Sequence, residues 1–249
     1  MGDEASARSI EPRAWEAVLE HVERRLLDGD LAPGDRLPGE RALAADLGVG
    51  RSSVREALRV LEVLGLIRTH TGSGPTAGAI IIATPAGGMS ALMRLQVAAN
   101  GFPVRDIVET RLVLEAHVAG DLAAASARAD LAAVERLLDA MDDPSLDRAE
   151  FLALDAAFHL ALAEASGNQV ITATMAGLRS GIEGYALAGS ARIADWRATA
   201  ARLRREHRGI LEAVRAADPA AARARINDHI AGYYAEISPD ADRGAAAPH

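Results

Sequence analysis

The residues best suited to do chemistry in this sequence are one aspartate and three histidines in its second half: Asp155, His159, His207 and His229. Asp155 and His159 are four positions apart in an apolar-periodic stretch, and on a helix this spacing places both side chains on one face, one turn apart. The apolar residues around them indicate that this face is half buried. Polar groups held there need partners, and a divalent metal ion is one partner that could satisfy all four side chains.

A metal site competes with a simpler interpretation, since an isolated histidine on an apolar helix face is more often a structural residue than a ligand. Four such groups on three different predicted helices favour the metal, provided that the helices are neighbours. The sequence has no cysteine, so the ligands must be imidazoles and carboxylates. Three imidazoles and one carboxylate suit Zn²⁺ or another borderline first-row metal such as Ni²⁺ or Mn²⁺, whereas Ca²⁺ requires more oxygen ligands. The sequence therefore predicts a divalent-metal site, with Zn²⁺ favoured.

Arg111 is the candidate for binding an organic anion beside this site. It lies among apolar residues in a predicted core helix, and a guanidinium group held near a metal would bind a carboxylate through two parallel hydrogen bonds. The alternative is an intrahelical ion pair between Arg111 and Glu115, which would contribute only about 0.3–0.5 kcal/mol to stability. The sequence alone does not decide whether Arg111 binds an anion or pairs with Glu115.

The composition limits the class of protein. A chain of 249 residues is long enough for one large or two ordinary domains. The hydrophobic share is 49% and the aromatic share only 3%, and the abundance of Ala, Leu and Val favours an α-rich protein. No run of about 18 uncharged apolar residues occurs, so a membrane span is not expected, and residues 1–15 do not have the pattern of a signal peptide. Together with the absence of cysteine, these features predict a cytoplasmic protein.

The net charge is −8, and all 27 basic residues are arginine. A chain this acidic is not expected to coat DNA without sequence preference. A sequence-specific DNA-binding protein remains compatible with it, because phosphate contacts are local and screening acts over about 8 Å at physiological salt. Whether a segment can bind DNA must therefore be judged from its own local charge.

The first third of the chain has the pattern of a winged helix-turn-helix. Predicted helices at 14–27, 40–47 and 51–64 are followed by two short strands near 66–70 and 79–82, with glycine-containing turns between them. In this motif the second helix of the pair enters the major groove with its N-terminal residues at base edges. Those residues are Arg51, Ser52, Ser53 and Arg55. An arginine stripe alone would more often be a solvated helix face, but the surrounding pattern favours DNA binding.

The rest of the chain is predicted to be helical. Apolar periodicity predicts seven helices, at about 89–99, 104–127, 129–141, 147–166, 168–188, 193–216 and 219–236. Short connections between long helices indicate antiparallel neighbours and hence a bundle. We therefore predict a mainly α protein: a winged helix-turn-helix domain at 8–80, a linker at 81–90 that contains Pro85–Gly88, a helical domain at 91–237 and a disordered tail at 238–249.

The first domain resembles the GntR family of bacterial repressors over about residues 12–76. The resemblance rests on the segments 37–44 (LPGERALA), 48–58 (GVGRSSVREAL) and 64–67 (LGLI). It implies DNA contacts at Arg41, Arg51 and Arg55, with His70 and Gly72 in the wing. Two departures are Gly39, where the family usually has Ser or Ala, and the wing at 70–76, which lacks the family's common Lys or Arg.

The second domain resembles the C-terminal effector domain of the FadR subfamily, the FCD domain, over about residues 90–236. The matching segments are 109–115 (ETRLVLE), 155–159 (DAAFH), 166–168 (SGN), 206–207 (EH) and 228–230 (DHI). The resemblance implies an all-α antiparallel bundle, a dimer, a metal held by the aspartate and three histidines, and an effector that is usually a small carboxylic acid. The predicted helix at 89–99 favours the seven-helix branch, and the complete Asp/His set argues against the acyl-CoA-binding members, which lack it.

The whole sequence predicts a ligand-responsive transcriptional regulator, a repressor that binds a palindromic double-stranded DNA operator as a homodimer and senses a small carboxylate. One alternative is a regulator that senses the metal ion itself. Another is a metal-dependent hydrolase, which is disfavoured because all four ligand positions are protein groups and no general base is expected beside them. Glu164 is two turns away, and Glu206 is expected to point elsewhere. An enzyme is therefore not expected.

Overall fold

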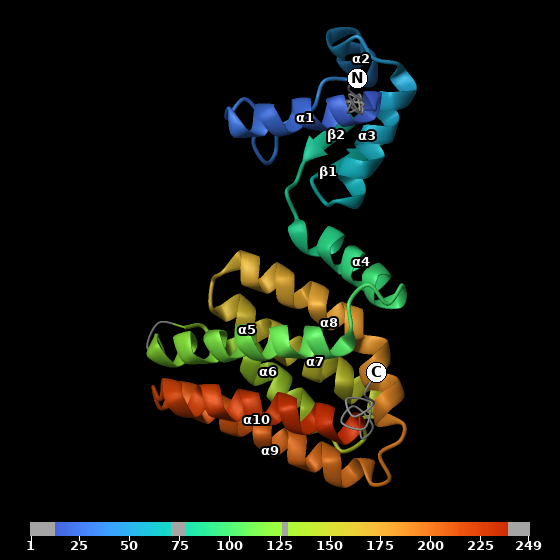
Figure 1. Cartoon of the computed structure of the whole chain (residues 1–249). Helices are drawn as coiled ribbons and strands as arrows, with labels where there is room; N and C mark the ends of the chain where they lie inside the picture. The colour runs from blue at the N-terminus through green and yellow to red at the C-terminus, as the bar shows by residue number, and fades with distance from the viewer. Residues whose placement is uncertain (1–12, 71–77, 126–128, 239–249) are drawn as a thin grey trace, which may run out of the picture. The chain divides into compact units, whose positions relative to one another are not determined.

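The computed structural model describes residues 13–70, 78–125 and 129–238, which form ten helices and two strands (Figure 1). The chain divides into two compact units, Met1–Gly88 and Met89–His249, and each has its own buried apolar core. No helix among the described residues is long and apolar enough to cross a membrane. The prediction of a mainly α protein is confirmed.

The N-terminal unit is a winged helix-turn-helix. Three helices, α1 (Ala14–Leu27), α2 (Glu40–Leu47) and α3 (Arg51–Val63), precede an antiparallel hairpin of β1 (Ile67–His70) and β2 (Gly78–Ile81). The strands pair in a register that runs from Ile67 opposite Ile81 to His70 opposite Gly78. Three helices followed by a two-stranded wing is the order that the sequence predicts.

The helix pair of this unit is positioned by one glycine and a shared core. Gly48 ends α2 in the left-handed conformation, with φ of 65°, which turns the chain toward α3. α3 buries Val54, Ala57 and Leu61 on one face, and Val54 belongs to the same core cluster as Val18 of α1. The opposite face of α3, which carries the arginines, therefore stays exposed.

Gly65 is a position where the fold of this unit requires glycine. Its φ is +73°, a left-handed conformation that side chains rarely adopt, and a Cβ atom there would lie 2.3 Å from the carbonyl oxygen of Thr84. We expect Gly65→Ala to lower the free energy of unfolding of this unit by more than about 1 kcal/mol in urea or thermal unfolding. Gly29→Ala is the matched control, because Gly29 has a φ of +79° and no atom within 4 Å of its Cβ position. Equal losses in the two variants would contradict the importance of the Thr84 contact.

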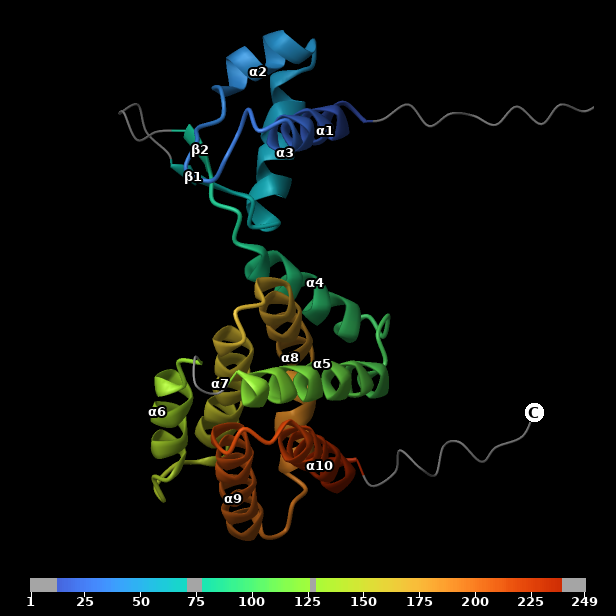
Figure 2. The same ribbon diagram turned by 90° about the vertical axis from the view of Figure 1, so that its left-hand side faces the viewer.

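In the part of the chain that the structure describes, the C-terminal bundle is built from seven helices, the first of which begins four residues before the boundary between the units. They are α4 (Pro85–Ala98), α5 (Val104–Ala124), α6 (Ala132–Met141), α7 (Arg148–Ala165), α8 (Gln169–Ser190), α9 (Trp196–Arg215) and α10 (Pro219–Ile237). α10 packs beside α5 and α9, and α7 packs beside α6 and α8 (Figures 1 and 2). The predicted all-α bundle with seven helices is confirmed.

Two predicted boundaries differ from the observed ones. The helix predicted at about 89–99 begins earlier, at Pro85, so the stretch Pro85–Gly88 of the predicted linker forms the first turn of α4. Proline is tolerated there because a helix N–H group in the first turn would have no partner anyway. The helix predicted to end at residue 188 continues to Ser190, so the break after it falls two residues later than predicted. Gly189 lies against Ile237 of α10, where a Cβ atom would come within 2.9 Å of the isoleucine side chain. Near the end of α8, glycine at this position therefore allows two helices to approach closely.

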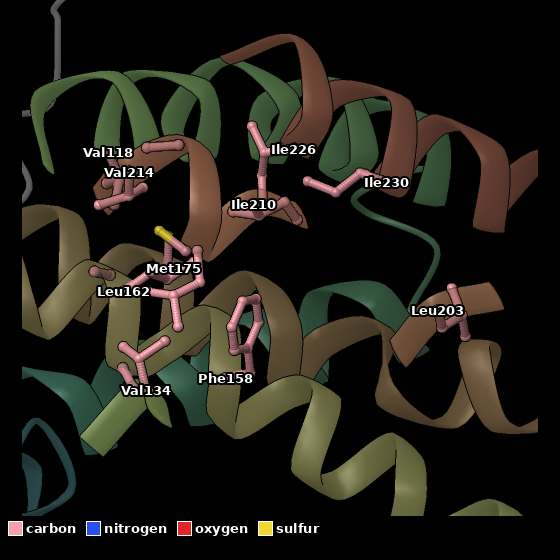
Figure 3. Packing of buried hydrophobic residues seen from close by; sticks show 14 of the residues in the cluster. Val118, Val134, Phe158, Leu162, Met175, Leu203, Ile210, Val214, Ile226 and Ile230 are labelled. Atoms are coloured by element: carbon pink, nitrogen blue, oxygen red, sulfur yellow. The ribbon is translucent and has the colours of Figure 1, made fainter. Parts of the chain in front are cut away.

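One large apolar core holds the bundle together. Phe158 of α7, Ile210 of α9 and Ile226 of α10 belong to it and lie in the same interior (Figure 3). Phe158 and Ile210 are fully buried. Because these three helices also carry the candidate metal ligands, the packing of the core determines how the faces that carry the histidines meet.

Candidate metal centre and DNA-binding surface

The aspartate and the three histidines meet in the interior of the bundle. α7 carries Asp155 and His159, α9 carries His207, and α10 carries His229. One ligand atom of each side chain lies within 4.8 Å of those of the other three. The histidines are buried, and 17% of the Asp155 side chain is exposed. The condition that the three helices be neighbours is therefore met.

The imidazole rings turn their Nε2 atoms toward one point. Nε2 of His229 lies 3.1 Å from Nε2 of His159 and from Nε2 of His207. Oδ1 of Asp155 lies 3.0 Å from Nε2 of His207 and 3.7 Å from Nε2 of His159 and His229. Bonds of about 2.0–2.2 Å to one ion would separate neighbouring ligand atoms by roughly 3–3.6 Å. Three of the quoted distances fall in this range and two, at 3.7 Å, are slightly longer, so the four side chains are close to the arrangement that a first-row metal requires.

Two carboxylates hold the far sides of the rings. Nδ1 of His229 is 2.9 Å from Oε2 of Glu206, and Nδ1 of His159 contacts Oε2 of Glu115. A carboxylate in this position accepts the Nδ1 proton, which leaves Nε2 free to bind a metal. The expectation that Glu206 points elsewhere is wrong, because α10 brings His229 within hydrogen-bond distance of it.

The ionisation of the cluster also suits a metal. Burial alone would raise the pKa of Asp155, but hydrogen bonds from the three histidines hold it well below its usual range. Burial lowers the pKa of His207 to about 3, and the charge of His229 adds to this effect. Metal ligands must be ionised carboxylates and neutral imidazoles, which is the state of Asp155 and His207 at neutral pH. Burial would lower the pKa of His229, but hydrogen bonds to Asp155 and Glu206 raise it, so a proton there can balance the negative charge that a metal would otherwise balance.

A cavity of about 350 Å³ lies beside the cluster, and Asp155, His159 and His229 form part of its wall. Arg111, the predicted anion-binding residue, also lines it and is 4% exposed. Its Nε donates a hydrogen bond of 2.8 Å to Glu115, and its Nη1 donates one of 2.9 Å to the hydroxyl of Tyr234. The two interpretations of Arg111 are therefore compatible, because the residue pairs with Glu115 and lines the cavity as well.

Arg179 of α8 is a residue of this site that the sequence pattern does not identify. It lines the same cavity, its Nη2 donates a 2.8 Å hydrogen bond to Oδ2 of Asp155, and its Nη1 lies 3.5 Å from Oε1 of Glu115. The available signal is a single charge in an otherwise small and apolar segment, 175–182 (MAGLRSGI). Only its neighbours in space distinguish it from a solvated arginine.

The predicted DNA contacts lie on the N-terminal unit. Exposed side chains are Arg41, Arg51, Ser52, Arg55 and His70, while Ser53 is half-buried and Gly72 lies outside the described residues. Nε of Arg55 donates a 2.8 Å hydrogen bond to Oε2 of Glu40, and Nη2 of Arg51 lies 3.6 Å from the same oxygen. Glu40 of α2, which the sequence argument does not include, therefore holds two arginines of α3 side by side.

Two family models match this chain. The model of the FCD domain matches residues 106–232, and the model of bacterial regulatory proteins of the gntR family matches residues 15–76. The FCD match includes the aspartate, the three histidines and both cavity arginines. The gntR match includes α2, α3 and the first strand of the wing.

Curated relatives are transcriptional regulators. The chain is 32% identical over 168 residues to the Glc operon transcriptional activator of Escherichia coli (strain K12), an alignment covering 66% of this chain and 65% of that protein. The chain thus spans slightly less than two thirds of that relative's length. It is 31% identical over 217 residues to the HTH-type transcriptional regulator LutR of Bacillus subtilis (strain 168), which covers 84% of this chain and 97% of LutR.

A solved structure of a Streptococcus agalactiae GntR protein matches with a TM-score of 0.57 and 25% identity, covering 88% of this chain and 98% of that one. The matched families and these relatives are regulators rather than enzymes. The winged helix-turn-helix, the helical effector domain and these matches lead to one conclusion: the chain belongs to the GntR family, in its FadR subfamily with an FCD domain, and is a DNA-binding transcriptional regulator.

Proposed function

We propose that this regulator senses a small carboxylate metabolite in a metal-containing pocket of its C-terminal unit and that the metabolite controls DNA binding. The observation that carries the proposal is the convergence of one aspartate and three histidines beside a cavity of about 350 Å³ that Arg111 also lines. A buried guanidinium group next to a cation site is suited to an organic anion.

Different residues of the pocket would bind different parts of the effector. Asp155 and the three histidines would hold Zn²⁺, or Ni²⁺ or Mn²⁺, and such an ion, when bound, supplies positive charge to a carboxylate oxygen. Arg111 orients the carboxylate through the N–H groups that remain beside its bonds to Glu115 and Tyr234. To change DNA affinity about 5- to 150-fold, the effector must favour one arrangement of the protein by roughly 1–3 kcal/mol.

On DNA, we infer a homodimer that binds a palindromic operator in the cytoplasm as a repressor. Dimeric helix-turn-helix proteins place one recognition helix in each half-site, with half-sites separated by about one helical turn or a multiple of it. The exposed arginines at the start of α3 support this arrangement. The E. coli relative is named an activator, so a reporter gene placed behind the operator decides between repression and activation.

Operator binding by the full chain tests the proposal when it is measured with zinc, with a chelator and with a panel of organic acids. We expect at least one acid to change operator affinity and chelation to abolish that effect. If chelation switches DNA binding and no acid has an effect, the protein senses the ion itself. Turnover of an acid would support the metal-dependent hydrolase instead.

Two arginines are expected to differ in what they contribute to DNA binding. Arg51→Ala should relax base preference at one position, since an arginine–guanine pair discriminates by about 1–3 kcal/mol. Arg41→Ala should weaken binding to all sequences alike. It should also reduce the slope of log affinity against log salt concentration by about one. Titrations against the operator and its single-base variants at two salt concentrations measure both effects. Arg24→Ala, at the exposed end of α1, is the control, and unchanged affinity in either test variant contradicts that residue's role.

A further inference from the structure

Arg179 is a buried charge whose hydrogen bonds are incomplete. Its side chain is 9% exposed and lines the cavity, and only Nη2, which donates to Asp155, has a hydrogen-bonding partner among the described residues. The Nε and Nη1 atoms are buried and have no acceptor among those residues, although Nη1 lies 3.5 Å from a carboxylate oxygen of Glu115. Buried polar atoms of folded proteins nearly always have a partner, and a charged one left without it is destabilising. The side chain therefore has capacity for a further anionic acceptor.

The charges around the cavity point to the kind of acceptor. Arg111 and Arg179 carry two positive charges, and Glu115 and Asp155 carry two negative ones, so these four groups balance. The imidazoles are neutral when they bind a metal, and a divalent ion then adds two positive charges that no other buried carboxylate of the described cavity wall offsets.

Two other acidic groups lie close, and neither is buried. Glu206 contacts His229 but also pairs with Arg202, and these two side chains are 28% and 33% exposed. Glu183 reaches the wall of the cavity but is exposed. Water and salt screen exposed charges far more than buried ones, so the excess of two positive charges at the metal-loaded centre persists.

We propose that Arg179 is a specificity-determining residue of this cavity and that the effector it selects is a dianion, such as a dicarboxylate. One anionic group meets the metal-binding side of the cavity, and the second accepts hydrogen bonds from Arg179. The inference rests on the proposed function, because it assumes that a divalent ion and an acid occupy this pocket together. A cavity of about 350 Å³ is at the lower end of the range for small-molecule sites, roughly 300–1,000 Å³, which suits a short acid.

Calorimetric titration of the zinc-loaded full chain with matched acids tests the proposal. The probes are malonate, succinate and glutarate, each paired with its monomethyl ester, which keeps the length and removes one charge. We expect at least one diacid to bind about tenfold or more tightly than its ester, because a charge-assisted hydrogen bond is lost with the ester. Arg179→Met should remove this preference, and the exposed arginine variant Arg105→Met should keep it.

A second readout is the affinity for zinc itself. Linkage requires that the preferred diacid raise zinc affinity by the same factor by which zinc raises diacid affinity. We expect this coupling in the wild type and its loss in Arg179→Met, with one zinc still bound per chain. If Arg179→Met does not fold, Arg179→Lys is the second variant, because it retains the positive charge but lacks the planar guanidinium group. It should weaken the preference for the diacid over its ester and still bind zinc.

The outcomes separate this inference from the proposed function. If the diacids bind no more tightly than their monoesters, the dianion assignment is overturned and the carboxylate sensor stands. A preference that survives in both Arg179 variants overturns the role of Arg179. If no acid binds the zinc-loaded wild type and none changes operator binding, the proposed function fails together with this inference.

Discussion

Replacing Glu115 with leucine is expected to lower the free energy of unfolding of the C-terminal unit by about 3–5 kcal/mol, because it leaves buried positive charge without its partner. Glu115 is 3% exposed, pairs with Arg111 at 2.8 Å and also contacts His159 and Arg179. Urea unfolding followed by circular dichroism measures the loss. The variant should also bind zinc more weakly, since His159 loses the carboxylate that orients its ring.

The same helix offers a matched control. Arg105 and Glu109 form an ion pair with the same spacing of four residues and the same 2.8 Å distance, but their side chains are 81% and 59% exposed. Glu109→Leu should therefore cost less than about 1 kcal/mol. Similar losses of unfolding free energy in the two variants would show that burial does not determine how much the Glu115 pair contributes to stability.

The difference in stability between the wild type and Glu115→Leu should change with pH in a definite direction. Burial alone would raise the pKa of Glu115, but the charge of Arg111, followed by His159, holds it below its usual range. A carboxylate with a lowered folded-state pKa contributes stability that is complete above its unfolded pKa and lost as the pH falls through the folded value. The difference in stability between the wild type and Glu115→Leu is therefore full at neutral pH and shrinks in acid.

Removing zinc from the zinc-loaded wild type is expected to lower the Tm of the C-terminal unit by roughly 5–10 °C, since a ligand at one hundred times its Kd stabilises by about 2.7 kcal/mol. His207→Ala should lose this response, because the variant lacks one of the four proposed ligands. Its zinc affinity should fall by more than about 100-fold, since loss of an outer-sphere partner alone costs about 10- to 100-fold. Elemental analysis and thermal unfolding with and without chelator measure both quantities.

The control for this experiment is His117→Ala. His117 is on α5, its side chain is 55% exposed, and its Nε2 lies 3.3 Å from Oδ2 of the equally exposed Asp121. Its Tm should still fall on chelation, as in the wild type. Because His207 also packs against the ring of Phe158, the decisive quantity is the change in Tm caused by chelator, not the Tm itself. A His207→Ala protein that still responds to chelator would exclude His207 as a ligand.

Much of the fold could be predicted because it is encoded locally. The periodicity of apolar residues and the turn residues between them predict the order of the elements, from the winged helix-turn-helix to the seven-helix bundle. The predicted end of α8 falls two residues too early, before Gly189, because glycine has two uses, at the ends of helices and where two helices approach closely. Only the partner, Ile237, which lies far away in the sequence, shows which of them applies.

The sequence by itself determined which residues could be metal ligands and that Asp155 and His159 share a helix face. Spacing along one helix is a local property, so four positions mean one turn in any fold. Only the tertiary structure decided that His207 and His229 complete the cluster, that Glu206 and Glu115 hold the rings, and that Arg179 lines the cavity. Helical periodicity sets where a side chain lies around its own helix axis, but not how that helix is rotated and shifted against its neighbours. Those two quantities come from the packing of the whole core, and they determine which buried charges meet.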